Sequence, residues 1–110
     1  MTAEQLTKWL VEERKDFTLI DVRTPRDFDA GHIKGAINIA VPDLLNAEAL
    51  KKLPKDRNLL LYSNATGQAA QAAVVLQLAG LRAYSLLGGF DHWVRYALEP
   101  KAVGPAEHEQ

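Results

Sequence analysis

The sequence of 110 residues contains no cysteine. This absence excludes disulfide bonds, thiolate metal sites, and any intermediate carried on a cysteine, such as a persulfide. The sequence also lacks an apolar run of the roughly 18–20 residues that a membrane-spanning helix needs, and no hydrophobic segment typical of a signal peptide follows the first residues. We therefore expect a cytoplasmic protein without a membrane partner.

The sequence also has no large excess of positive or negative charge. The chain has 13 basic and 14 acidic residues, which gives a net charge of -1 and no reason to expect a nucleic-acid partner. Its three histidines do not have the spacing of metal ligands, so we expect no metal and no cofactor. The length fits a single domain over residues 1–110, with a core of about residues 3–98 and a polar tail over 99–110. We expect a monomer.

Helical and strand patterns alternate along the chain. Thr2 and Gln5 have the spacing of a capping box at the start of a helix, and Gly80 is placed as a helix stop. The helix before Gly80 is predicted to bury Ala72, Val75, Leu76 and Ala79. The alternation predicts an α/β fold with a mostly parallel sheet covered by helices on both faces. The expected helices cover residues 3–14, a turn after Thr24, and 42–53, 69–79 and 90–97; the expected strands cover 17–22, 36–39, 58–62 and 83–87.

The loop after the third strand is the strongest candidate site. It joins that strand to a helix, and the free N–H groups and dipole of a helix start favour an anion there. Such a loop suits a reactive thiolate, but Ser63 stands at the position where a thiol would be expected. The candidate anion-binding residues are Ser63, Asn64, Ala65, Thr66, Gly67, Gln68 and Ala69.

Two motifs resemble those of rhodanese-like domains. The first runs from Leu19 to Arg23 and continues through Pro25, Phe28 and the segment 31–39. The second is Leu87-Gly88-Gly89-Phe90 with Trp93, preceded by Ala79-Gly80. The resemblance covers about residues 3–98 and implies a five-stranded, mostly parallel sheet flanked by helices on both faces.

The resemblance also implies what an active site would contain. In active relatives a nucleophilic cysteine begins the loop, accepts sulfane sulfur from a donor such as thiosulfate, and is usually followed by an arginine five positions later. Those positions are Ser63 and Gln68 here, in a loop of the length that sulfurtransferases have. A serine cannot hold a stable persulfide, and a neutral glutamine cannot supply the charge of an arginine.

The sequence therefore predicts an inactive relative of the thiosulfate sulfurtransferases. We expect it to act as a regulatory module that binds a protein partner or a small anion similar to thiosulfate or sulfate. The alternative is a sulfurtransferase whose nucleophilic cysteine has been replaced by Ser63. A single engineered change of that kind would leave Gln68 unexplained.

Residues outside the loop have weaker claims. Arg23 follows the first strand, at the sheet edge where α/β proteins bind ligands, so it is a possible ligand contact. The simpler interpretation of Arg23 is a salt bridge with Asp27 or Asp29. The resemblance assigns structural roles to Asp21 and to His32.

A serine hydrolase is the remaining alternative. Ser63 would need a histidine base, with His32 and His92 as candidates, and a carboxylate behind it, for which Asp21 is the candidate. We expect His32 to pack and to cap a loop, His92 to lie on the surface of the last helix, and Trp93 to pack in the core.

Overall fold

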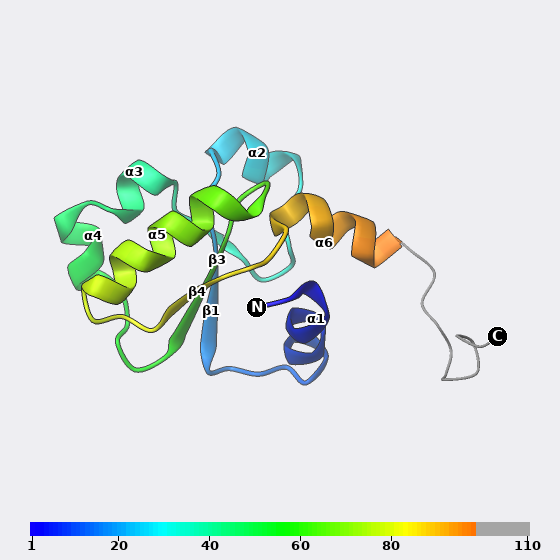
Figure 1. Cartoon of the computed structure of the whole chain (residues 1–110), viewed down its shortest axis with the longest axis horizontal. Coiled ribbons are helices and arrows are strands. Elements are labelled where there is room, and N and C mark those ends of the chain that lie inside the picture. The colour runs from blue at the N-terminus through cyan, green and yellow to red at the C-terminus, as the bar shows by residue number, and fades with distance from the viewer. Residues whose placement is uncertain (99–110) are drawn as a thin grey trace.

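Four strands pair in parallel in the order β2-β1-β3-β4 in the computed structural model, which describes residues 1–98 (Figure 1). The predicted polar tail over 99–110 lies outside the described residues. No helix in residues 1–98 has the length and apolar character needed to cross a membrane. The elements in chain order are α1 (Ala3–Val11), β1 (Phe17–Asp21), α2 (Pro25–Ala30), β2 (Ile37–Asn38), α3 (Val41–Leu44), α4 (Ala47–Lys52), β3 (Asn58–Tyr62), α5 (Thr66–Leu78), β4 (Ala83–Ser85) and α6 (Gly89–Leu98).

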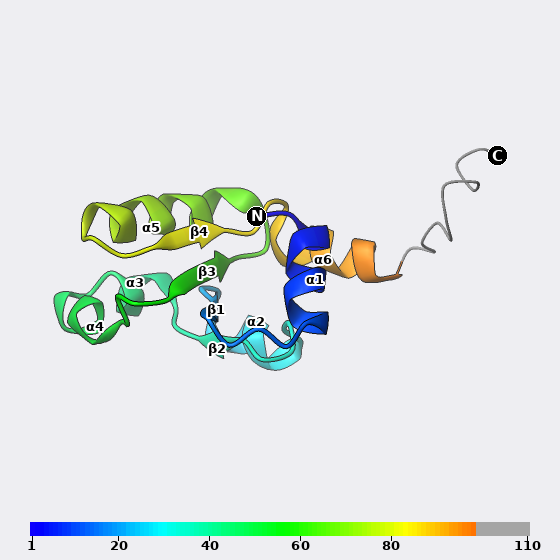
Figure 2. The ribbon, with the colours of Figure 1, turned by 90° about the horizontal axis from the view of Figure 1, so that it is seen from below.

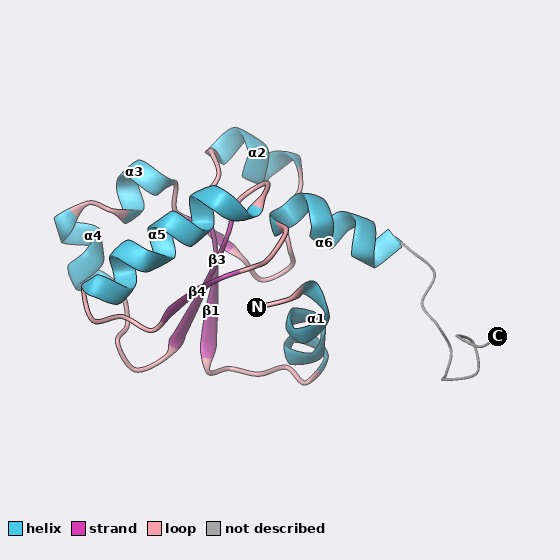
Figure 3. Ribbon diagram, viewed as in Figure 1, coloured by secondary structure: helices cyan, strands magenta, loops and turns pink. Residues whose placement is uncertain are grey.

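Each face of the sheet is covered by its own helices, as the two views show (Figures 2 and 3). Successive side chains of a strand point to opposite faces, so Ile20 and Leu61 belong to one core while Leu19 and Leu60 belong to the other. Helices α3, α4 and α5 pack on the first face, and α1, α2 and α6 contribute to the second. The predicted α/β fold with helices on both faces is confirmed.

The prediction of a fifth strand was wrong for the described residues. At the outer edge of β4, Met1 donates from its ammonium group to the Ser85 carbonyl at 2.9 Å and accepts from the Leu87 N–H at 2.8 Å. These are contacts of a neighbouring strand, but they extend over one residue only. Thr2 then caps α1 in the predicted capping box with Gln5, and the chain turns away from the edge.

Two helix predictions also need correction. The helix expected over residues 42–53 is two short helices, because the Asn46 side chain accepts from the Glu48 N–H and starts a new helix. Helix α5 begins at Thr66, three residues earlier than expected, and both Val75 and Ala79, which were predicted to be buried, are exposed. Its buried stripe is Ala69, Ala72, Ala73 and Leu76, because small alanines let the helix pack closely on the sheet.

Candidate functional site

The candidate site lies where the sheet changes its direction of winding. The chain leaves β1 toward β2 on one side, and it leaves β3 toward β4 on the other. The carboxyl ends of β1 and β3 are neighbours, with Asp21 paired to Tyr62. Open α/β sheets bind ligands in the crevice at such a point. A cleft of about 290 Å³, here called the Ser63 cleft, lies there and is lined by Val22, Arg23, Thr24, Asp27, Ala40, Val41, Pro42, Ser63, Asn64 and Gln68.

Ser63 and Gln68 are hydrogen-bonded to each other inside this cleft. Ser63 is only 4% exposed, and its Oγ donates to Gln68 Oε1 at 2.8 Å. The hydroxyl proton is thereby committed to a neutral amide and not to a histidine base. His32 stacks on Phe28 with ring centroids 3.7 Å apart, and its Nδ1 lies 2.8 Å from the Phe28 carbonyl oxygen. Within residues 1–98, neither His32 nor His92 forms a hydrogen bond with Ser63, so the Ser–His pair of a hydrolase is not assembled in the described part of the chain.

The start of α5 leaves its backbone donors available to a ligand. Its N-cap, Ala65, makes no side-chain hydrogen bond to the helix, and the first N–H groups of any helix have no intrahelical acceptor. The Thr66 hydroxyl is turned the other way, where it accepts from the Gly88 N–H at 2.7 Å. The expected loop residues thus lie together at a helix N-terminus, and Thr66, Gly67 and Gln68 belong to its first turn.

Helix α6 holds the other side of the loop. The N–H groups of Phe90 and Asp91 donate to the carbonyls of Ser63 and Asn64 at 2.8 and 3.0 Å. Gly89 permits this contact, since a Cβ there would lie 2.5–2.7 Å from three loop carbonyl oxygens, and its φ is +62°. The glycine pair of the second family motif is therefore what brings α6 against the loop.

Substituting Gly89→Ala should destabilise the protein by about 2 kcal/mol, because both the left-handed backbone and the backbone clash oppose a side chain. Urea unfolding followed by circular dichroism measures this loss. Gly67→Ala is the matched control, since among residues 1–98 no atom beyond its chain neighbours and the nearby backbone of its own helix lies within 4 Å of the added Cβ and alanine favours a helix. Equal stability of the two variants would contradict the proposed role of Gly89.

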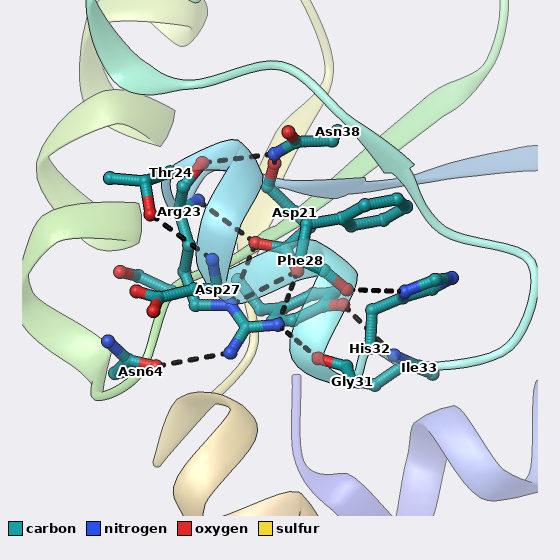
Figure 4. Close-up of polar contacts among 12 residues, drawn as sticks. Asp21, Arg23, Thr24, Asp27, Phe28, Gly31, His32, Ile33, Asn38 and Asn64 are labelled. Atoms are coloured by element: carbon teal, nitrogen blue, oxygen red, sulfur yellow. Dashed lines mark hydrogen bonds and ion pairs between the residues drawn. The ribbon is translucent and has the colours of Figure 1, made fainter.

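Arg23 is the centre of a buried polar network at the cleft (Figure 4). Its Nε and one terminal nitrogen donate to the Asp21 carboxylate, the latter at 2.7 Å, and the same terminal nitrogen donates to the Gly31 carbonyl at 2.7 Å. The other terminal nitrogen donates to Asn64 Oδ1 at 3.3 Å. The hydrogen bonds to Asp21 raise the pKa of Arg23 above its ordinary value. Arg23 therefore connects β1 to the Ser63 loop.

The partner of Arg23 differs from the expected one. The simpler interpretation named Asp27 or Asp29, whereas the ion pair is with Asp21, whose side chain is fully buried. Residues two apart in extended chain project to the same side, so the spacing of Asp21 and Arg23 was the available signal. Four of the five N–H donors of a guanidinium are used here, which leaves one for a ligand.

Two further polar residues near the carboxyl end of β1, Asn38 and Tyr62, were not predicted as site residues. Asn38 donates from Nδ2 to the carbonyls of Asp21 and Arg23 at 2.9 and 3.0 Å, which fixes the backbone beside the cleft.

The buried Tyr62 hydroxyl accepts from the Ile33 N–H at 3.0 Å. The Arg23 guanidinium lies 4.3 Å from the centre of the Phe90 ring. Trp93 packs at the margin of the core that contains Tyr62, as expected for a structural residue.

Burial raises the pKa of the Tyr62 hydroxyl well above its ordinary value. The folded protein therefore keeps this proton, whereas the tyrosine of the unfolded chain ionises near pH ~10. The contribution of Tyr62 to the free energy of unfolding is therefore fully present below that pH and is lost as the pH rises above it. Tyr62→Phe should cost about 1–2 kcal/mol at pH 7, because the Ile33 N–H loses its acceptor. The difference in unfolding free energy between Tyr62→Phe and the wild type should become about 1 kcal/mol smaller near pH ~11, because only the wild type is destabilised by ionisation of this tyrosine in the unfolded chain.

Urea unfolding at both pH values tests this expectation. Tyr84→Phe is the control, because Tyr84 is 48% exposed. If the difference in unfolding free energy between Tyr62→Phe and the wild type were the same at both pH values, the pKa of Tyr62 in the folded protein would equal its value in the unfolded chain.

No group of three or more potential metal ligands occurs among residues 1–98. The cleft residues are also unsuited to bind a metal, because the one carboxylate lining it, Asp27, is accompanied by neutral side chains and Arg23. Its polar groups are hydrogen-bond donors and acceptors of the kind that hold a small polar ligand or a segment of another protein.

Comparison with known families agrees with this fold. The model of the rhodanese-like domain matches residues 2–96. The chain belongs to the rhodanese-like domain family. It lacks the cysteine on which sulfur transfer in that family depends, since none occurs in the sequence.

Among its relatives are proteins named as sulfurtransferases. The chain is 38% identical over 104 residues to the probable adenylyltransferase/sulfurtransferase MoeZ of Mycobacterium tuberculosis, with 94% of this chain and 26% of MoeZ covered. It is 31% identical over 97 residues to a sulfurtransferase of Allochromatium vinosum, with 87% and 88% covered. The crystal structure of the Alr3790 protein from Anabaena sp. superimposes with a TM-score of 0.79 at 31% identity, with 91% and 77% covered. The chain thus spans about a quarter of the length of MoeZ.

Proposed function

We propose that this chain is a non-catalytic rhodanese-like domain whose Ser63 cleft binds a small anion or a carboxylate of a partner protein. The observation that supports it most directly is the hydrogen bond between Ser63 and Gln68. The positions of the nucleophile and of its positively charged helper hold two neutral side chains that bind each other. Both requirements of sulfur transfer, a thiolate and a cation for the donor, are absent from these positions.

Backbone donors can still hold an anion after those side chains are lost. The first-turn N–H groups of α5 and the single remaining donor of Arg23 are the positive features of the cleft. Asp21 offsets the charge of Arg23, and the Asp27 carboxylate lines the same cleft. We therefore expect weak anion binding, with dissociation constants in the millimolar range of about 1–10 mM.

Titration of the ¹⁵N-labelled protein with sulfate and with thiosulfate tests the proposal. The amide signals of residues 63–69 should shift in a saturable manner, and sodium chloride at equal ionic strength should not reproduce the shifts. Asp27→Asn should tighten binding about threefold, because it removes a repelling charge. The exposed Asp29 gives the matched control Asp29→Asn, which should leave binding unchanged. Absence of shifts at residues 63–69 would rule out the anion role.

The second candidate is a sulfurtransferase in which Ser63 replaces the catalytic cysteine. The sequence similarity to the sulfurtransferase of Allochromatium vinosum favours it, and Gln68 opposes it. The two candidates differ in whether a cysteine at position 63 alone restores activity.

A further inference from the structure

A second recess lies at the end of the sheet where the strands begin, which is opposite the end that holds the Ser63 cleft. Its volume is about 350 Å³. The side chains around it come from the end of α1, the start of β1, and the segments before β2 and β3. We call it the basic groove; its lining residues are Leu10, Arg14, Lys15, Phe17, Thr18, Leu19, Lys34, Gly35 and Arg57.

The floor of the basic groove is an unpaired stretch of sheet edge. On one side, β3 pairs with all of β1, from Phe17 to Asp21. On the other side, β2 pairs only with Ile20 and Asp21. Within residues 1–98, the segment from Phe17 to Leu19 therefore has a strand neighbour on one side only. Such an edge presents backbone groups to which an extended segment can pair.

Part of this edge is occupied by an arginine side chain. Arg57 donates to the carbonyls of Lys15 and Phe17, the latter at 3.1 Å. Its Nε is buried and makes no hydrogen bond in the described part of the chain. The guanidinium thus takes the place of backbone donors at the start of the edge and places a positive charge beside it.

The charge of the groove selects its occupant. Four cations and no carboxylate line it. Arg14 is paired with Asp16, whereas Lys15 and Lys34 are exposed and form no ion pair within residues 1–98. Because the same cations would face each other, pairing with the edge of a second copy is disfavoured. An acidic segment would meet charges of opposite sign in the groove.

We propose that the basic groove binds an extended acidic segment of a partner protein, which adds as a strand beside Phe17 to Leu19. Its carboxylates lie against Lys15 and Lys34, and its apolar side chains contact Leu10 and Phe17. This site is separate from the Ser63 cleft, since the two lie at opposite ends of β1. The proposal does not depend on the function assigned to that cleft.

Fluorescence anisotropy with a labelled peptide tests this site. The probe is Ac-Glu-Val-Glu-Ile-Glu-Val-Glu-amide, which alternates acidic and β-forming residues. Lys15→Glu combined with Lys34→Glu should weaken its binding at least about tenfold at low salt. Lys51→Glu combined with Lys52→Glu makes the same charge change on α4, outside the groove, and should change binding less than about twofold. Equal losses in both double variants would overturn the proposal.

Two further probes separate strand pairing from simple charge attraction. The same peptide N-methylated at alternate residues keeps its charge but loses backbone donors, so it should bind at least about tenfold more weakly. Amide signals of residues 17–19 should shift with the unmodified peptide and residues 63–69 should not. Equal binding of the methylated peptide, or of an oligouridylate, would show that any polyanion suffices and would refute strand addition.

Discussion

The variant Asp21→Ala is expected to lose about 3–5 kcal/mol of unfolding free energy, because it leaves the Arg23 guanidinium buried without a counter-charge. Arg23 has a side-chain exposure of 5%, and Asp21 one of 0%. The same change also removes the acceptor of the Arg23 backbone N–H. Urea unfolding at neutral pH measures the loss.

The matched control is Asp29→Ala, an exposed carboxylate on α2, which should change stability by less than about 0.5 kcal/mol. A double-mutant cycle with Arg23→Met isolates the pair. The loss of unfolding free energy in Asp21→Ala combined with Arg23→Met should be about 1–3 kcal/mol smaller than the sum of the losses in the two single variants, since no uncompensated charge remains. A loss below about 1 kcal/mol for Asp21→Ala would show that water reaches Arg23 when its partner is absent.

Restoring sulfur transfer should require two substitutions. The wild-type protein should transfer no sulfur from thiosulfate to cyanide. Ser63→Cys places a thiol at the start of α5, where free N–H groups lower its pKa, yet Gln68 supplies no charge to hold the thiosulfate dianion. Ser63→Cys with Gln68→Arg should therefore exceed Ser63→Cys in kcat/KM by about a hundredfold or more.

Cyanolysis assays and mass spectrometry of the persulfide measure these effects. Ala47→Cys is the control for a thiol at a helix start, because Ala47 is exposed at the first position of α4, and it should remain inactive. If Ser63→Cys alone reached the rate of the double variant, the second candidate would be favoured: a sulfurtransferase that lost only its nucleophile.

The strands and the main loop could be predicted because their signals are local. The strand over 58–62 and the cap formed by Thr24 occur where the sequence indicates them. The positions of Ser63 and Gln68 in one cleft also follow from the motif spacing, since a strand, loop and helix of fixed length must bring them close. Their direct hydrogen bond depends on side-chain rotamers, which spacing does not determine.

Features that depend on contacts between distant segments were not predictable in the same way. Asn38 and Gly31 form hydrogen bonds with the segment around Arg23 because the fold brings these segments together. The exposed Val75 shows a related difficulty, because both candidate faces of α5 are apolar and only the packing against the sheet selects between them. Strand β2 is likewise only two residues long and follows the left-handed Gly35, whose φ is +90°, so it pairs with Ile20 and Asp21 and not with the start of β1.

The presence of Ser63 and Gln68 in place of a cysteine and an arginine has a consequence for how the protein responds to oxidants. Met1 is the sole sulfur-bearing residue of the chain, so the cleft offers peroxides and disulfide reagents no atom to oxidise. A domain built this way keeps the same binding surface under oxidising and reducing conditions. If the cleft binds an anion as proposed, oxidants should not change its affinity by modifying a cleft side chain.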